Sequence, residues 1–185
     1  MITLKSNLLN LKSKIVMPRP DLTRVPQFYY KYISLVKEDD LLNAFANETK
    51  NLFQFLDSIL VSKQDYAYAP GKWTLKELLQ HMIDSERVFA YRALSFSRKD
   101  SNKLPGFEEK DWAIASNSAG RNWNDLIEEF KTVRKSTEYL FASFNEEQLN
   151  AEGFANNNSI YVMAIGFICV GHANHHIGII KERYL

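Results

Sequence analysis

The sequence predicts an all-α protein, a four-helix bundle with one long crossover connection and a short N-terminal helix. Four long segments carry apolar residues at steps of three and four, which is the spacing of a helix with one buried face. No segment shows the alternation of apolar and polar residues that would predict a convincing strand. The connection over residues 98–121 is long enough for a crossover rather than a simple turn between antiparallel helices.

The composition narrows the class of protein. The 185 residues fit one domain, and 45% hydrophobic with 24% charged residues is an ordinary globular balance. The 23 basic and 22 acidic residues are well mixed, so no basic face points to nucleic acid. Cys169 is the only cysteine, which excludes an intrachain disulfide and suits a reducing compartment. The longest apolar run, about ten residues within 162–171, is too short to span a bilayer.

The N-terminal region divides into a tail and the start of the domain. Residues 1–16 contain three lysines and no acidic residue, and we expect a flexible tail that is dispensable for folding. A single domain is expected over residues 17–185. It opens with Met17-Pro-Arg-Pro, where two prolines force extended backbone. Five apolar and aromatic residues within 27–36 then predict a short helix that lies across the main body.

The first two long helices have recognisable starts. Asp39 or Asp40 is a good N-cap for a helix that ends near residue 60, and a loop follows over residues 62–72. Thr74 and Glu77 have the spacing of a capping box, which begins a second helix that ends near residue 97.

The third and fourth helices follow the long connection. The third is expected over residues 124–144, and the sequence predicts a polar loop over residues 145–158. Asn158 or Ser159 is expected to cap the last helix, which extends to about residue 183. This helix is apolar or small on every side from residue 162 to 170, which predicts that other helices surround it.

Three of the four histidines lie near the end of that helix. His172 and His176 are four residues apart and share a face, whereas His175 is turned by about 100° from His176. Buried imidazoles must be hydrogen-bonded or metal-bound, because unpaired polar groups are costly to bury. The alternative is a pair of surface histidines near a helix end.

The fourth histidine, His81, lies in the inward stripe of the second helix. A lone histidine there is usually a hydrogen-bonded core residue. If the second and fourth helices are neighbours, however, His81 can meet His172 and His176, and three imidazoles suit Zn, Ni or Fe with coordination positions left open. An open site indicates catalysis or substrate binding. Cys169 could close it as a fourth ligand, but a buried core cysteine is the favoured interpretation.

Five short motifs resemble the DinB-like superfamily, in particular its YfiT-like metal-dependent enzymes. They are Pro70-Gly-Lys-Trp-Thr74, His81-Met-Ile-Asp-Ser-Glu86, Tyr91-Arg92-Ala93-Leu94, Leu104-Pro-Gly-Phe107 and Gly171-His-Ala-Asn-His-His176. The resemblance covers about residues 17–185. It implies a four-helix bundle with a divalent metal held by His81, His172 and His176, and it leaves His175 outside the ligand set.

The same resemblance implies an enzyme that uses a metal to activate a thiol or a water molecule. Relatives include S-transferases with low-molecular-weight thiols as co-substrates, and hydrolases. We expect S-transfer or hydrolysis of a small molecule, with thiol activation slightly favoured because no internal base is evident. Zn or Ni is the leading metal, with Fe or Mn as alternatives. Asp84, Glu86, Tyr91 and Arg92 are candidates for substrate contacts or for the base, although each is more often a supporting or surface residue.

The alternative class is a non-enzymatic metal-binding or interaction module, which could form a homodimer through aromatic helix faces. For either class we expect a cytoplasmic protein without nucleic-acid or membrane partners.

Overall fold

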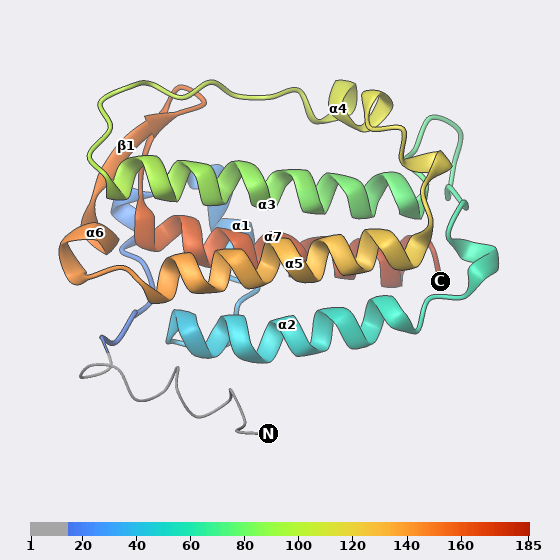
Figure 1. Ribbon diagram of the computed structural model, residues 1–185, viewed down its shortest axis with the longest axis horizontal. Helices are drawn as coiled ribbons and strands as arrows, with labels where there is room; N and C mark the ends of the chain where they lie inside the picture. The colour runs from blue at the N-terminus through green and yellow to red at the C-terminus, as the bar shows by residue number, and fades with distance from the viewer. Residues whose placement is uncertain (1–14) are drawn as a thin grey trace.

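The computed structural model describes residues 15–185, and four long helices form its body (Figure 1). These helices are α2 (Leu41–Asp57), α3 (Leu75–Ser97), α5 (Trp123–Ala142) and α7 (Val162–Arg183). Each of them matches one of the four periodic segments of the sequence. The predicted all-α four-helix bundle is therefore confirmed.

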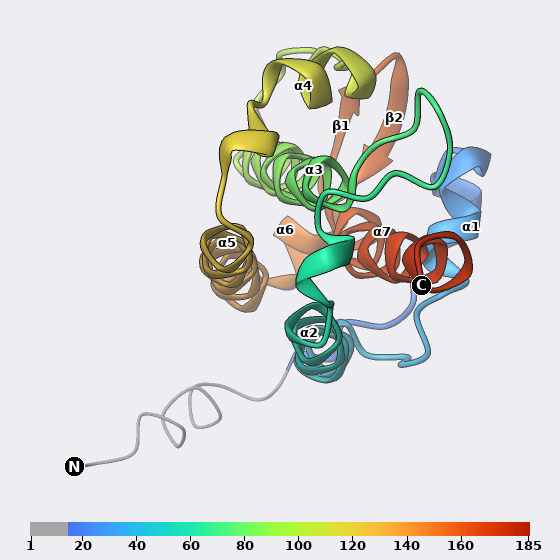
Figure 2. The ribbon, with the colours of Figure 1, turned by 90° about the vertical axis from the view of Figure 1, so that its right-hand side faces the viewer.

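The order of the helices around the bundle differs from their order in the chain. α3 and α2 each pack against both α5 and α7, so α2 and α3 lie on a diagonal, as the end-on view shows (Figure 2). Residues 98–122 return along the length of α3, so α3 and α5 run in the same direction (Figure 1). The predicted crossover is therefore present. It contains two short elements that the sequence pattern did not reveal, α4 (Glu109–Ala115) and the 3-10 turn η5 (Ser118–Gly120).

Side-chain caps fix the starts of three long helices. The Asp40 carboxylate accepts a hydrogen bond from the Asn43 amide at the start of α2. Thr74 and Glu77 form the predicted capping box, and α3 then extends to Ser97 as expected. Asn122 caps α5 in the same way. The connection from α2 to α3 includes one 3-10 turn, η4 (Val61–Lys63).

The segment before α7 was predicted wrongly. Residues 145–158 form a short helix, α6 (Glu146–Asn150), and most of an antiparallel hairpin, whose strands are β1 (Glu152–Ala155) and β2 (Asn158–Tyr161). The turn is Asn156-Asn157, and both residues have positive φ (49° and 61°), the conformation that a two-residue hairpin turn requires. α7 consequently begins at Val162 after Tyr161, which supplies no side-chain cap, so neither Asn158 nor Ser159 is its N-cap.

The hairpin holds one end of the crossover. Leu104 donates its amide to the Phe154 carbonyl at 2.9 Å and accepts from the Asn156 amide at 3.1 Å. The same hairpin packs on α3, where a Cβ at Gly153 would overlap the Phe96 ring. Glycine is thus needed at this close approach. Together these contacts set where the crossover starts its path along α3.

The short N-terminal helix lies across α7, as predicted (Figure 2). It comprises the 3-10 turn η3 (Gln27–Tyr29) and α1 (Tyr30–Ile33), and η2 (Leu22–Arg24) precedes it. The contact is very close, because a Cβ on Gly171 of α7 would overlap the Tyr32 carbonyl. Gly171 therefore permits α1 to sit beside the histidines of α7.

Most of the expected N-terminal tail, residues 1–14, lies outside the described residues. Ile15 packs against the core, and Met17 is buried with its amide N–H donating to the Asp40 carboxylate at 3.1 Å. Met17 also accepts from the Leu41 amide at 2.9 Å. From residue 17 onward the chain is thus joined to the start of α2.

α7 is the central helix of the core. Every residue from Val162 to Ala173 is buried, in agreement with the apolar pattern of the sequence. By length and composition α7 could cross a membrane, with a mean hydropathy of 1.3 over 18 residues, but 72% of that window is buried inside the bundle. Packing by the surrounding helices is sufficient to explain its apolar character.

Candidate metal centre

Three histidines from two neighbouring helices meet inside the bundle. α3 supplies His81 and α7 supplies His172 and His176, and one ring nitrogen of each lies within 4.8 Å of the others. The four-residue spacing in α7 stacks two imidazoles on one face, and the packing of α3 on α7 brings the third to them. The structure therefore brings together the three residues that the sequence singled out.

The distances among the rings suit a shared cation. The Nε2 atoms of His172 and His176 are 3.0 Å apart. The centroid of the His81 ring lies 5.2 Å from the centroid of the His172 ring and 5.0 Å from that of the His176 ring. Nitrogen ligands at 2.0–2.1 Å from a tetrahedral ion would be about 3.4 Å apart. The two nitrogens of α7 are slightly closer than this spacing, and all three ligand nitrogens lie within 4.8 Å of one another.

Burial keeps the three imidazoles neutral. Desolvation lowers the pKa of His81 to about 4. It also lowers the pKa values of His172 and His176 well below their usual range, and the neighbouring histidines add to this effect. Near neutral pH the cluster thus offers unprotonated nitrogens, which is the form that binds metal.

Two polar details concern the ring nitrogens that point away from the other imidazoles. The Nδ1 atom of His176 is buried and has no hydrogen-bond partner within residues 15–185. Because Nε2 of the same ring faces His172, this orphaned nitrogen lies on the far side of the ring from the cluster, where a buried water is the usual partner. The Ser85 hydroxyl lies 3.5 Å from His81 Nδ1, so the opposite nitrogen, Nε2, is left to face the other two rings.

Aromatic side chains surround the cluster. Trp73 lies over the His81 ring with centroids 4.8 Å apart, and the Tyr184 hydroxyl donates to the Trp73 carbonyl at 2.7 Å. Tyr32 and Phe89 contact the His172 ring edge-on at 5.5 Å and 5.6 Å. These contacts limit the entry of water, so charges inside the cluster are weakly screened.

His175 and Cys169 lie outside the cluster. His175 is half-buried beside Tyr32, with 5.2 Å between the ring centroids, as the 100° offset predicted. Cys169 is fully buried in the core, and the group of nearby ligand-type residues within 15–185 contains only the three histidines. A closed site with a cysteine ligand is therefore not formed.

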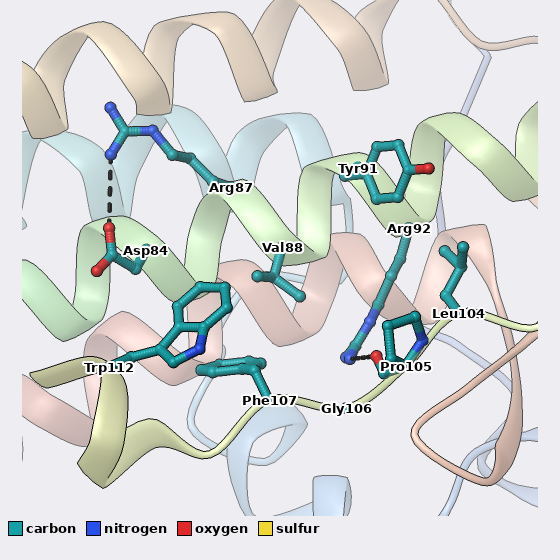
Figure 3. Close-up of a pocket in the computed structure, with 10 residues that line it drawn as sticks. All are labelled: Asp84, Arg87, Val88, Tyr91, Arg92, Leu104, Pro105, Gly106, Phe107 and Trp112. Atoms are coloured by element: carbon teal, nitrogen blue, oxygen red, sulfur yellow. Dashed lines mark hydrogen bonds and ion pairs between the residues drawn. The ribbon is translucent and has the colours of Figure 1, made fainter. Parts of the chain in front are cut away.

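The four residues proposed for substrate contacts or the base separate into two groups. Glu86 is not in the histidine cluster and forms a buried ion pair with Arg134 of α5, at 2.6 Å. Asp84, Tyr91 and Arg92 line a cavity of about 350 Å³ between α3 and the crossover (Figure 3). None of the three histidines lines this cavity, so none of the four residues belongs to the histidine cluster.

Sequence reasoning missed several residues around the cluster. Ser85 lies within one of the five motifs and was given no role there, although its position four residues after His81 is a recognisable signal. Trp73 lies just before the N-cap of α3, within another of the five motifs, and Tyr184 is the C-cap of α7; no helical spacing connects either of them to His81. Only the packed structure places Trp73 on the His81 ring and Tyr184 on Trp73.

Comparisons with known proteins agree with this architecture. The comparison with curated proteins gives no match. Among solved structures, the chain is similar to YfiT from Bacillus subtilis, described as a "probable metal-dependent hydrolase with an unusual four-helix bundle topology". The TM-score is 0.64 at 18% identity, over 88% of this chain and 89% of that one, which shows a shared fold. A family model described as the DinB superfamily matches residues 44–180, and the chain belongs to that superfamily.

Proposed function

We propose that His81, His172 and His176 hold one divalent metal ion and that the protein is a metal-dependent hydrolase of small molecules. The observation that carries the proposal is the convergence of three buried, neutral imidazoles without a fourth protein ligand among the described residues. The reaction class is supported by the shared fold with YfiT, which is described as a probable metal-dependent hydrolase.

A divalent ion held in this way supplies a Lewis acid, which polarises a carbonyl or lowers the pKa of a water or thiol that binds at an open position. The residues of the chain determine the charge, the orientation of the ligands and the access of water at the site. Three neutral ligands leave the charge of the ion uncompensated, and Ser85 orients His81. Trp73 and Tyr32 limit water access and so strengthen electrostatic interactions at the site.

A second candidate is S-transfer with a low-molecular-weight thiol. It is favoured by the lack of a carboxylate in the histidine cluster of residues 15–185, because a thiol can lose its proton at a metal without a general base. The thiol would come from solution, since Cys169 is buried in the core. A hydrolase, by contrast, needs a group outside the cluster to take the proton of water.

The first test is metal content. We expect about one divalent ion per wild-type chain by elemental analysis, and strongly reduced content after His81→Ala or His176→Ala. His175→Ala is the matched control, because it removes a neighbouring imidazole that lies outside the cluster, and it should retain the ion. Equal metal content in the wild type and in a His81/His172 double alanine variant would refute the site.

The second test separates the reactions. Metal-loaded protein is assayed with ester and amide substrates, and then with an electrophile plus a low-molecular-weight thiol, each with and without chelator. Chelator-sensitive hydrolysis in the absence of thiol supports the hydrolase, whereas turnover only with thiol supports S-transfer. Binding of metal without any turnover across both panels would favour the non-enzymatic alternative.

A further inference from the structure

The cavity between α3 and the crossover has one feature that the histidine cluster does not explain. It runs along α3 from Asp84 to Arg92, and the crossover residues Pro105, Phe107 and Trp112 cover it (Figure 3). Its volume of about 350 Å³ falls within the range of small-molecule sites. We propose that this cavity binds a small amphipathic carboxylate, with the carboxylate on Arg92 and the apolar body over Val88.

Arg92 carries the charge argument. The residue is only 5% exposed, yet none of the ion pairs among residues 15–185 includes it. Among the described residues, its Nη2 donates a hydrogen bond to the Pro105 carbonyl at 3.0 Å. Burial raises the pKa of the neighbouring Tyr29 hydroxyl, and the Arg92 cation partly offsets that rise. The close partners of this guanidinium are therefore neutral oxygens.

A second buried arginine in the same protein provides the comparison. Arg134 is 1% exposed, and its guanidinium meets the Glu86 carboxylate through three hydrogen bonds of 2.6–3.0 Å. Buried charges are normally paired in this way, because an uncompensated buried ion is costly. Arg92 lacks such a carboxylate within residues 15–185, and it lies beside a cavity that could admit one. A bound carboxylate would make the fork-shaped pair that guanidinium groups favour.

The remaining charges of the cavity compensate one another. Asp84 accepts from Gln80 at 2.9 Å and lies 3.6 Å from Arg87, which in turn pairs with Glu129 at 2.7 Å. In Figure 3 Asp84 and Arg87 lie at the Trp112 end, and Arg92 lies at the Pro105 end. The uncompensated positive charge is thus at one end only, which fixes the direction of the ligand.

The rest of the wall fits an apolar body. Phe107 and Trp112 lie with ring centroids 4.7 Å apart, and Trp112 remains 45% exposed although it is large and aromatic. In Figure 3 both rings stand across the cavity from Val88. An aromatic or aliphatic group of the ligand would cover the exposed aromatic surface, which favours binding through the hydrophobic effect.

The test is isothermal titration calorimetry with 4-phenylbutyrate and its uncharged counterpart 4-phenylbutanol, at low salt. We expect the wild-type protein to bind the carboxylate about ten- to a hundredfold more tightly than the alcohol, as for hydrogen bonds to a charged group. Arg92→Met should remove this preference. Arg98→Met is the matched control, because Arg98 is exposed just beyond α3 and outside the cavity, and it should keep the preference.

Two further variants secure the interpretation. Val88→Phe fills the cavity while it leaves Arg92 in place, so it should weaken both ligands and keeps the test valid if Arg92→Met does not fold. His176→Ala should leave binding unchanged; loss of binding in this variant would mean that the carboxylate sits on the metal, and it would overturn the cavity proposal. Equal affinity of the wild type for acid and alcohol, or no binding of either, would show that Arg92 only anchors the crossover through Pro105.

Discussion

Cys169 illustrates how burial determines the chemistry of a single residue. Desolvation in the core raises the pKa of its thiol well above the ordinary 9.0, and the nearby Glu86 carboxylate adds to the rise. The neutral thiol is a poor nucleophile. A thiol reagent at pH 8 should leave the native protein unmodified and label one cysteine per chain in denaturant. Stability should fall above pH 9, because the unfolded chain then releases a proton that the folded chain retains. Rapid labelling of the native protein would contradict this burial.

The Glu86–Arg134 pair gives a residue-scale prediction about stability. Arg134 also lies within 3.5 Å of the Thr49 hydroxyl, so the pair connects α3, α5 and α2. Glu86→Leu should lower the free energy of unfolding by about 3–5 kcal/mol, because it leaves a buried cation without a partner. The Glu86→Leu/Arg134→Met double variant should recover most of this loss in urea denaturation. Similar losses in the single and double variants would show that packing, rather than charge, dominates here.

The sequence predicted only those features of the site that depend on spacing within one helix. The spacing of His172 and His176 lies within one helix, and their approach to His81 required only that α3 and α7 be neighbours. The partner of Glu86, in contrast, is 48 residues away on another helix. Arg134 falls on the buried stripe of α5, between Phe130 and Thr137, but its charge suggests exposure, so the pattern alone did not predict its burial.

The contact between α1 and α7 can be tested with glycines of the same helix. A Cβ on Gly171 would overlap the Tyr32 carbonyl, a backbone atom that cannot move alone, so Gly171→Ala should lower the free energy of unfolding by about 1–3 kcal/mol. Gly178→Ala is the control, because no atom of residues 15–185 beyond its own helical turns lies within 4 Å of its Cβ position. It should stabilise α7 by about 0.5–1 kcal/mol, the usual helix-interior gain. Urea denaturation measures both, and a stabilising Gly171→Ala would contradict the packing of α1.

α3 was predicted accurately and the hairpin was missed, because the signals of α3 are local and the hairpin depends on contacts with distant parts of the chain. α3 has a capping box and a long apolar stripe, and both are local signals, so its bounds were predicted within one residue. The hairpin has four-residue strands, and its stability depends on packing against α3 and on the bridge to Leu104. Its signal was the Asn156-Asn157 pair between short apolar groups, which a search for long periodic segments overlooks.

At the scale of the molecule, the fold should not depend on the proposed metal. The four long helices bury wide apolar faces, and most of α7 is enclosed, so burial supplies most of the stability. Chelation should leave the helical circular dichroism intact and lower the melting temperature only as far as metal affinity and free concentration dictate. Loss of helical signal in the metal-free protein at room temperature would instead indicate a structural metal.

The central position of α7 also has a consequence for how the protein is made. α1, α2 and α3 all pack on α7, yet they leave the ribosome before it. Roughly 90 residues separate the end of α3 from the end of α7, which corresponds to ~5–20 s of synthesis at 5–20 residues per second. During this time the apolar faces of the earlier helices have no central partner. The nascent chain must therefore wait, with exposed faces that chaperones can bind, until α7 emerges and the bundle closes around it.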